Sequence, residues 1–139
     1  MSEFSESLKE RSMTFAEAVL RLVDRLPPSP SGRVIAYQLA SSATAVTSNY
    51  RATCNARSRR EFIAKLGVVV EEADESVCWL ELLSRREMLP RSELQPVLHE
   101  SIELRNIFGK SLGTARANSR YQTATKVATR TPSIDQLTR

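Results

Sequence analysis

The sequence predicts an all-α protein, an antiparallel up-and-down four-helix bundle that ends in a disordered basic tail. The 139 residues include only 4 Gly, and the 41% of residues that are hydrophobic are spread along the chain, which disfavours a β-rich or low-complexity protein. Apolar residues recur at spacings of three and four over four long segments, the pattern of amphipathic helices. Short connections join these segments, as in an antiparallel bundle.

The third segment, 58–86, has the longest helical pattern and contains no proline. Ser58 and Glu61 match a capping box, in which the serine side chain accepts a hydrogen bond from the Glu61 amide. Its apolar stripe consists of Phe62, Leu66, Val69, Ala73, Val77, Leu80 and Leu83. Because a long amphipathic helix depends on tertiary packing, we expect the other segments to pack against this one.

The first two helices are expected over residues 5–26 and 31–53. The stretch 26–30, with the sequence L-P-P-S-P, separates them. Proline disfavours helical geometry in the residue before it and cannot donate to the helical ladder, so this stretch ends the first helix.

The last helix is expected over residues 92–117. Ser92 is its expected N-cap, which places Pro96 in the first turn, where a missing donor costs little. The sequence that follows is basic, rich in Thr and Ser, and poor in large apolar residues. We therefore expect one bundle domain over residues 1–118 and a disordered basic tail over residues 119–139.

Several features predict a cytoplasmic protein without membrane association. The N-terminal residues lack the charged-then-apolar pattern of a signal peptide. No apolar run approaches the roughly 20 residues that a membrane span needs. Cys54 and Cys78 each lie within a helical pattern, which indicates reduced, packed thiols.

The sequence has few residues suited to catalysis, and we expect neither enzymatic activity nor a cofactor. Its one histidine, His99, has Pro96 three residues before it, so the paired Glu-x-x-His motifs of di-iron bundles are missing. We expect His99 at the surface. A second candidate is the acidic cluster of Glu71, Glu72, Asp74, Glu75 and Glu81. It could bind a metal, but a solvated or salt-bridged face is favoured, and we expect no metal site.

The strongest candidate site is the basic connection between the second and third helices. It carries Arg51, Arg57, Arg59 and Arg60, and no acidic residue occurs from 51 to 60. Arg59 and Arg60 fall in the first turn of a helix, where the helix dipole disfavours cations. This local cost suggests a compensating use such as phosphate binding. The alternative is a solvated turn that pairs with Glu61 and neighbouring carboxylates. Tyr50, one turn earlier, could stack on a base, although a core position is favoured.

The region also resembles a known family. The resemblance is carried by Ser48-Asn49-Tyr50-Arg51-Ala52, by 56–66 (A-R-S-R-R-E-F-I-A-K-L), by Glu71-Glu72-Ala73-Asp74-Glu75 and by Trp79-Leu80-Glu81-Leu82-Leu83. These segments are similar to the bacterial four helix bundle protein family. Its members include the S23-like proteins encoded in intervening sequences of 23S ribosomal RNA genes and the accessory variability determinant of diversity-generating retroelements. The resemblance covers roughly Phe15 to Leu112.

The resemblance implies a bundle protomer that assembles as a homopentamer and has no enzymatic activity. Because the retroelement members bind nucleic acid and reverse transcriptase through basic surfaces, it points to Arg51, Arg57, Arg59 and Arg60. One departure is the sequence S-N-Y-R-A-T over 48–53, where many members have A-N-I-A-E-G. We therefore predict a non-enzymatic oligomeric bundle that binds RNA or DNA through the arginine-rich turn. The alternative is a protein-interaction scaffold whose arginines contact neighbouring subunits or an acidic client protein.

Overall fold

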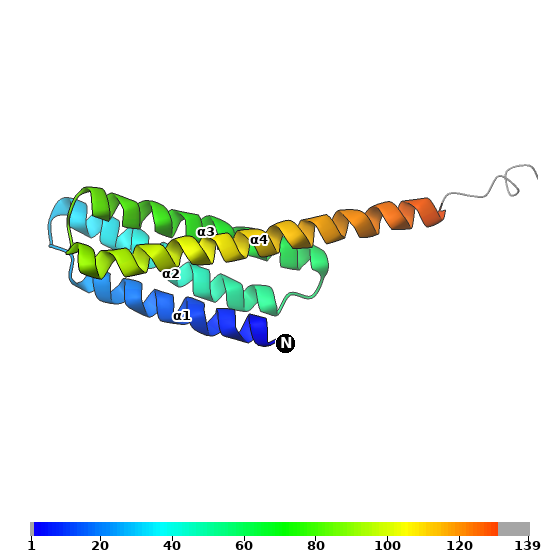
Figure 1. The fold of residues 1–139 in the computed structure, drawn as a ribbon, viewed down its shortest axis with the longest axis horizontal. Coiled ribbons are helices and arrows are strands. Elements are labelled where there is room, and N and C mark those ends of the chain that lie inside the picture. The colour runs from blue at the N-terminus through cyan, green and yellow to red at the C-terminus, as the bar shows by residue number, and fades with distance from the viewer. Residues whose placement is uncertain (1, 131–139) are drawn as a thin grey trace, which may run out of the picture.

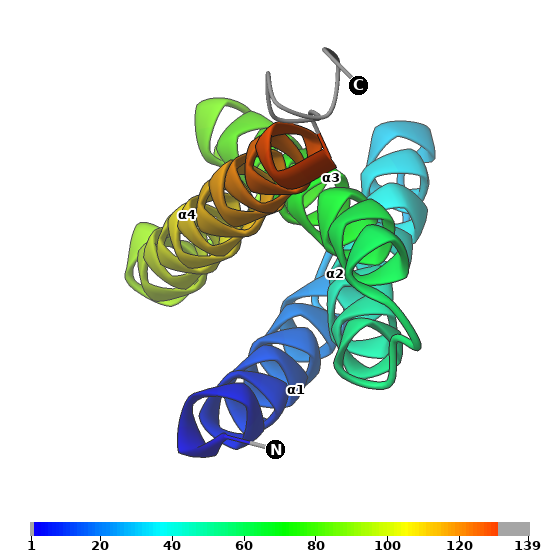
Figure 2. The same ribbon diagram turned by 90° about the vertical axis from the view of Figure 1, so that its right-hand side faces the viewer.

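A computed structural model describes residues 2–130, and within this range the chain forms four helices (Figure 1). The helices are α1 (Glu3–Asp24), α2 (Pro30–Cys54), α3 (Arg59–Arg85) and α4 (Arg91–Arg130). Each helix packs against the next, and α4 closes the bundle against α1. The end-on view shows that α1 and α4 separate toward the end that holds the N-terminus (Figure 2). The predicted all-α, up-and-down four-helix bundle is confirmed.

The core is one apolar cluster to which all four helices contribute. The predicted stripe of α3 is buried from Leu66 to Leu83, while Phe62 at its start is half-buried. The most completely buried large side chains include Val19, Leu39, Val46, Leu104 and Phe108. Burial of these side chains is the main term that stabilises the bundle.

Serine side chains cap the starts of three helices. Ser2 accepts a hydrogen bond from the Ser5 amide, Ser29 from the Gly32 amide and Ser58 from the Glu61 amide, each at 3.1 Å. Such a cap satisfies one of the amides that a helix leaves without a partner. The predicted cap at Ser58 is confirmed, whereas α2 begins slightly earlier than expected.

The start of α4 differs from the prediction. The Glu93 and Leu94 amides donate to the carbonyl of Pro90, at 3.0 and 3.1 Å, so Ser92 lies inside the helix and is not its N-cap. Pro96 consequently lies in the second turn. Because proline has no N–H, it cannot donate to the Ser92 carbonyl one turn earlier.

α4 continues as a helix well beyond the bundle (Figure 1). Among the α4 side chains described, which end at Val127, Leu112 is the last that is buried, and Tyr121 is 74% exposed. The hydroxyls of Thr123 and Thr125 donate to carbonyls one turn earlier, each at 3.0 Å. Residues 119–130 are thus helical where the sequence predicted the start of a disordered tail, because extending an existing helix adds one hydrogen bond per residue without a new nucleus. The rest of that predicted tail, 131–139, lies outside the described residues.

Both cysteines are free thiols. Cys54 is half-buried, but Cys78 is exposed and is therefore not packed as expected. Among residues 2–130, no helix has the length and apolar character needed to cross a membrane.

Candidate nucleic-acid interface

Four arginines are presented to solvent where α2 connects to α3. We call Arg51, Arg57, Arg59 and Arg60 the arginine turn, and all four are exposed. Within residues 2–130, none of them takes part in an ion pair, and the side chain of Glu61 lies 3.8 Å from Lys65. The pairing of these arginines with Glu61, the alternative that the sequence left open, is therefore not found.

The helix ends explain the electrostatics of the arginine turn. Arg51 lies in the last turn of α2, where the partial negative charge of the helix end favours a cation. Arg59 and Arg60 lie in the first turn of α3, where the partial charge is positive. The turn therefore combines unneutralised guanidiniums with a positive helix end, an arrangement that attracts anions.

α4 extends this positive charge along the molecule. No acidic residue occurs from 104 to 134. The cations of this stretch are Arg105, Lys110, Arg116, Arg120, Lys126 and Arg130. Arg105 pairs with Asp74 at 3.1 Å, whereas Lys110, Arg116 and Arg120 are exposed and unpaired within the described residues. Because α4 leaves the bundle at the end where α2 meets α3 (Figure 1), these cations add to the charge of that end.

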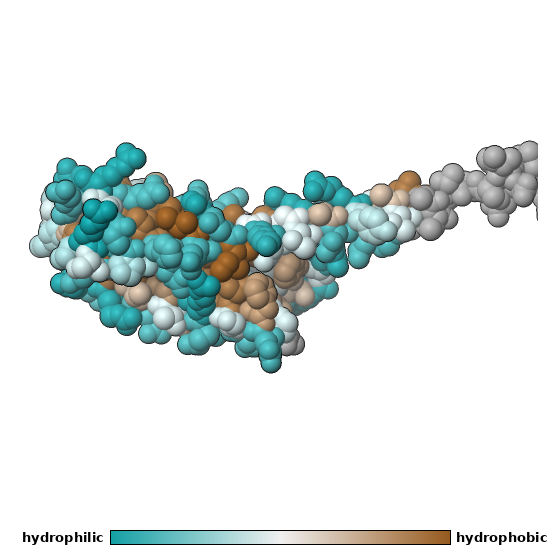
Figure 3. Space-filling model, viewed as in Figure 1, coloured by the Kyte–Doolittle hydropathy of each residue, from teal (hydrophilic) through white to brown (hydrophobic). Residues whose placement is uncertain are grey.

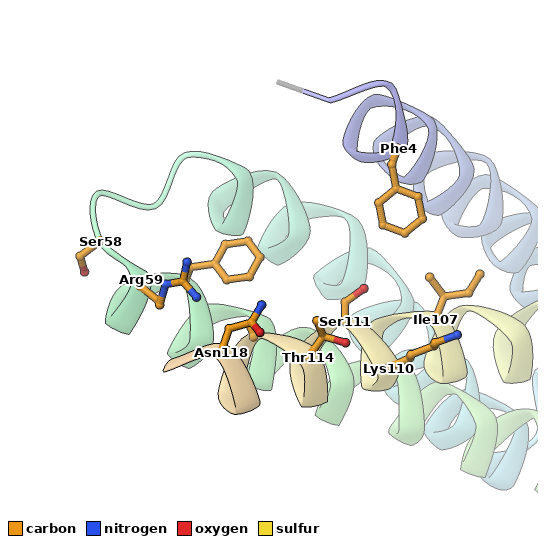
Figure 4. A pocket seen from close by; sticks show the side chains of 10 residues that line it. Phe4, Ser58, Arg59, Ile107, Lys110, Ser111, Thr114 and Asn118 are labelled. Atoms are coloured by element: carbon orange, nitrogen blue, oxygen red, sulfur yellow. The ribbon is translucent and has the colours of Figure 1, made fainter. Parts of the chain in front are cut away.

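A groove of about 980 Å³ lies beside the arginine turn. Its lining comes from the start of α1, the start of α3 and the middle of α4, and includes Phe4, Arg59, Phe62, Ile107, Lys110 and Asn118. Phe4 points from α1 toward Ile107 (Figure 4). Apolar surface is exposed close to the point where α4 leaves the bundle (Figure 3). This groove was not predicted from the sequence. The only signal for it was the aromatic residue Phe4, just before the expected start of the first helix.

The predicted surface position of His99 is confirmed, since its side chain is 75% exposed and lies 3.8 Å from Glu103. In the acidic cluster, burial raises the pKa of Glu72, and the carboxylates of Glu75 and Glu71 raise it further. The residues that the structure describes contain no group of three or more His, Cys, Asp or Glu side chains placed to hold a metal ion.

Tyr50 belongs to the core, as favoured from the sequence. Its ring packs against Phe108 at a centroid separation of 5.0 Å and an interplanar angle of 44°. Burial, together with the neighbouring Cys54, raises the pKa of Tyr50 to about 12. Its ring is therefore not available to stack on a base.

The fold and this end of the molecule define a four-helix bundle with an exposed cationic surface. Residues 7–110 match the family described as 23S rRNA-intervening sequence protein. Since this match covers most of the chain, the protein belongs to that family. The relation to the retroelement proteins stays a prediction.

A similar structure is that of a protein with unknown function from the S23 ribosomal protein family of Bacteroides thetaiotaomicron. The two chains are 30% identical, with a TM-score of 0.70, and the alignment covers 76% of this chain and 97% of the other. No curated protein matches the chain.

Proposed function

We propose that this chain is a non-enzymatic, cytoplasmic protein that binds the backbone of RNA or DNA through the arginine turn. The observation that carries the proposal is the set of four exposed guanidiniums that make no ion pair within residues 2–130. A guanidinium can donate two parallel hydrogen bonds to one phosphate. The family description, which refers to an intervening sequence of 23S rRNA, supports a nucleic-acid context.

The binding would be mainly electrostatic. Contacts to phosphate fix the position of a nucleic acid but carry no sequence information. Each phosphate that a cation neutralises releases counterions, so the affinity falls linearly on a plot of log affinity against log salt. Lys110, Arg116 and Arg120 on α4 would lengthen the contact along the strand.

The salt dependence of binding tests this proposal. Fluorescence anisotropy would measure the affinity for mixed-sequence RNA and duplex DNA between about 50 and 200 mM salt, for the wild type and the triple variant Arg57→Ala, Arg59→Ala, Arg60→Ala. If these arginines contact phosphates, the variant should bind less tightly. The slope of log affinity against log salt should become shallower by roughly 2–3. Unchanged affinity and slope would contradict the proposal.

A second candidate function is a protein-interaction scaffold, assembled as the homopentamer that the family resemblance implies. The observation that favours it is the part of α4 beyond the bundle, which is helical although the described side chains from 120 to 127 are exposed and Thr is frequent in it. A helix of this composition is marginal in water unless another surface packs against it. In this case the arginines would contact a neighbouring subunit or an acidic client protein.

Light scattering at micromolar concentration tests the scaffold. A particle with the mass of five 15.6-kDa chains would support it, and a monomer would contradict it. Loss of assembly in the triple arginine variant would place the arginines in the subunit contacts.

A further inference from the structure

We propose that the groove beside the arginine turn accepts an unpaired base, so that the protein binds single-stranded nucleic acid in preference to a duplex. This inference rests on the proposed function and specifies the form of nucleic acid that is bound. It follows from the side chains that line the groove, from their charge and from the position of the groove next to the phosphate-binding arginines.

The lining has the two chemical characters that a nucleotide requires. Phe4 from α1 and Phe62 from α3 provide aromatic surface, and Ile107 from α4 adds aliphatic surface. Arg59 and Lys110 provide positive charge for a phosphate. Proteins that bind single strands combine these features, because every base has a flat face that stacks on aromatic rings while its phosphate meets a cation.

Phe4 is placed to take part in such stacking. It is 58% exposed in the first turn of α1, and its ring points across the groove toward Ile107 (Figure 4). The volume of about 980 Å³ lies at the upper end of the range typical of small-molecule sites, about 300–1,000 Å³. The groove is therefore large enough for a base.

Charge favours an anionic occupant on the α3 and α4 sides. Arg59 belongs to both the arginine turn and the groove, so a strand whose phosphates lie on the turn would bring its next base to the groove. Lys110 makes no ion pair within the described residues. On the α1 side, Glu3 and Glu6 flank Phe4, and the charge of Glu6 is met by Lys9 at 3.2 Å.

The polar residues of the α4 wall favour a base over an acidic amphipathic peptide. Thr114 and Asn118 line the groove, and a hydroxyl and a carboxamide can each donate and accept hydrogen bonds. The edges of bases present both donors and acceptors, whereas the apolar face of an amphipathic helix presents neither. A duplex keeps its bases stacked and paired, so they cannot enter the groove.

The test compares three probes of equal phosphate number in anisotropy measurements: an oligothymidine, the same backbone with abasic sites, and a duplex. The variants are Phe4→Ala and, as a matched control, Tyr37→Ala, which removes a 74% exposed aromatic side chain from α2 away from the groove. Because both side chains are exposed, we expect both variants to keep the fold, which circular dichroism would check.

We expect the wild type and Tyr37→Ala to bind oligothymidine roughly 5- to 150-fold more tightly than the abasic strand, the range of one base stacked on an aromatic ring. Phe4→Ala should lose most of this difference while its affinity for the abasic strand and the duplex is unchanged.

Equal binding of the oligothymidine and abasic strands by the wild type would overturn the groove proposal. In that case, if the triple arginine variant bound both the oligothymidine and the abasic strand less tightly than the wild type does, the proposed function would stand. Tight binding of an acidic amphipathic peptide, displaced by no oligonucleotide, would overturn the proposal in favour of a protein partner.

Discussion

The guanidinium of Arg11 on α1 binds the carboxylate of Glu100 on α4 through two hydrogen bonds, from Nε to Oε2 at 2.9 Å and from Nη2 to Oε1 at 2.6 Å. Nη2 also lies 2.5 Å from Oε2 of Glu103. Hydrogen bonding to Glu100 raises the pKa of Arg11 above its already high ordinary value. α1 and α4 separate toward the end that holds the N-terminus (Figure 2). The groove lies between Phe4, seven residues before Arg11 on α1, and Ile107, seven residues after Glu100 on α4. The Arg11 pair therefore joins the two helices where the groove begins.

Replacing Arg11 should destabilise the bundle measurably. Arg11→Met removes the two-bond contact and leaves Glu100 and Glu103 as neighbouring like charges. Because the pair is about one-third exposed, we expect a loss of only about 1 kcal/mol in the free energy of unfolding, measured with urea. Arg21→Met is the matched control, since Arg21 is 70% exposed and lies 3.9 Å from Glu17. Equal losses in the two variants would contradict a structural role for the Arg11 pair.

The end of α3 contains a backbone position that glycine should fit better. The Met88 amide donates to the Leu83 carbonyl at 3.2 Å and the Glu87 amide to the Ser84 carbonyl at 3.1 Å, the two hydrogen bonds of a Schellman motif. Glu87 has a φ of 51°, in the left-handed region. Glu87→Gly should therefore raise the free energy of unfolding by about 0.5–1 kcal/mol.

The control for this substitution is Glu81→Gly, in the interior of α3. There glycine should lower the free energy of unfolding by about 1 kcal/mol. Chemical denaturation of both variants distinguishes the two positions. Destabilisation by both substitutions would show that Glu87 is not strained.

Glu72 should make the stability depend on pH. Its pKa is raised above the ordinary 4.5 by burial, by Glu75 and by Glu71. The folded state therefore holds the proton more tightly than the unfolded state, and stability falls as pH rises from about 4.5 through the raised pKa. Glu72→Gln should raise the free energy of unfolding at pH 7 by about 0.2–0.5 kcal/mol, the cost of one like-charge pair on a helix.

This gain should disappear below the ordinary carboxyl pKa, where Glu72 is neutral in both states. Denaturation curves across this pH range would measure the gain. Glu81→Gln is the control, because Glu81 is not among the carboxylates that raise the pKa of Glu72. A gain that is the same at every pH would contradict the electrostatic explanation.

The sequence predicted what depends on local pattern. The apolar stripe from Leu66 to Leu83 and the serine cap at Ser58 follow from spacing and residue type, and both are confirmed. The arginine turn was also visible as a run without acids. The groove was not, because it depends on how far α1 separates from α4, and this distance is set by packing along the whole bundle.

The length of α4 was also underestimated, for a different reason. Its sequence beyond residue 118 has the composition of a disordered segment. Composition alone does not show that this segment extends a helix that has already formed, which needs no new nucleus. Because none of the described side chains from 113 to 127 is buried, ending the chain after Asn118 should change the free energy of unfolding by less than about 0.5 kcal/mol. The same truncation should weaken RNA binding at low salt, since it removes Arg120 and the cations beyond it. Loss of the fold on truncation, seen by circular dichroism, would contradict this assignment.

We propose that nucleic acid is bound by the arginine turn itself and not simply by the net positive charge of the protein. The measurement that tests it most directly is RNA affinity in two triple alanine variants, one at positions 57, 59 and 60 and the other at Arg33, Arg85 and Arg91. The second set is also exposed and lies at the opposite end of the bundle, where α2 begins and α3 ends. Both variants lower the formal net charge of +4 by the same amount. We expect the first to lose about tenfold or more in affinity at low salt and the second to lose little. Equal losses in the two variants, or none in either, would contradict the claim.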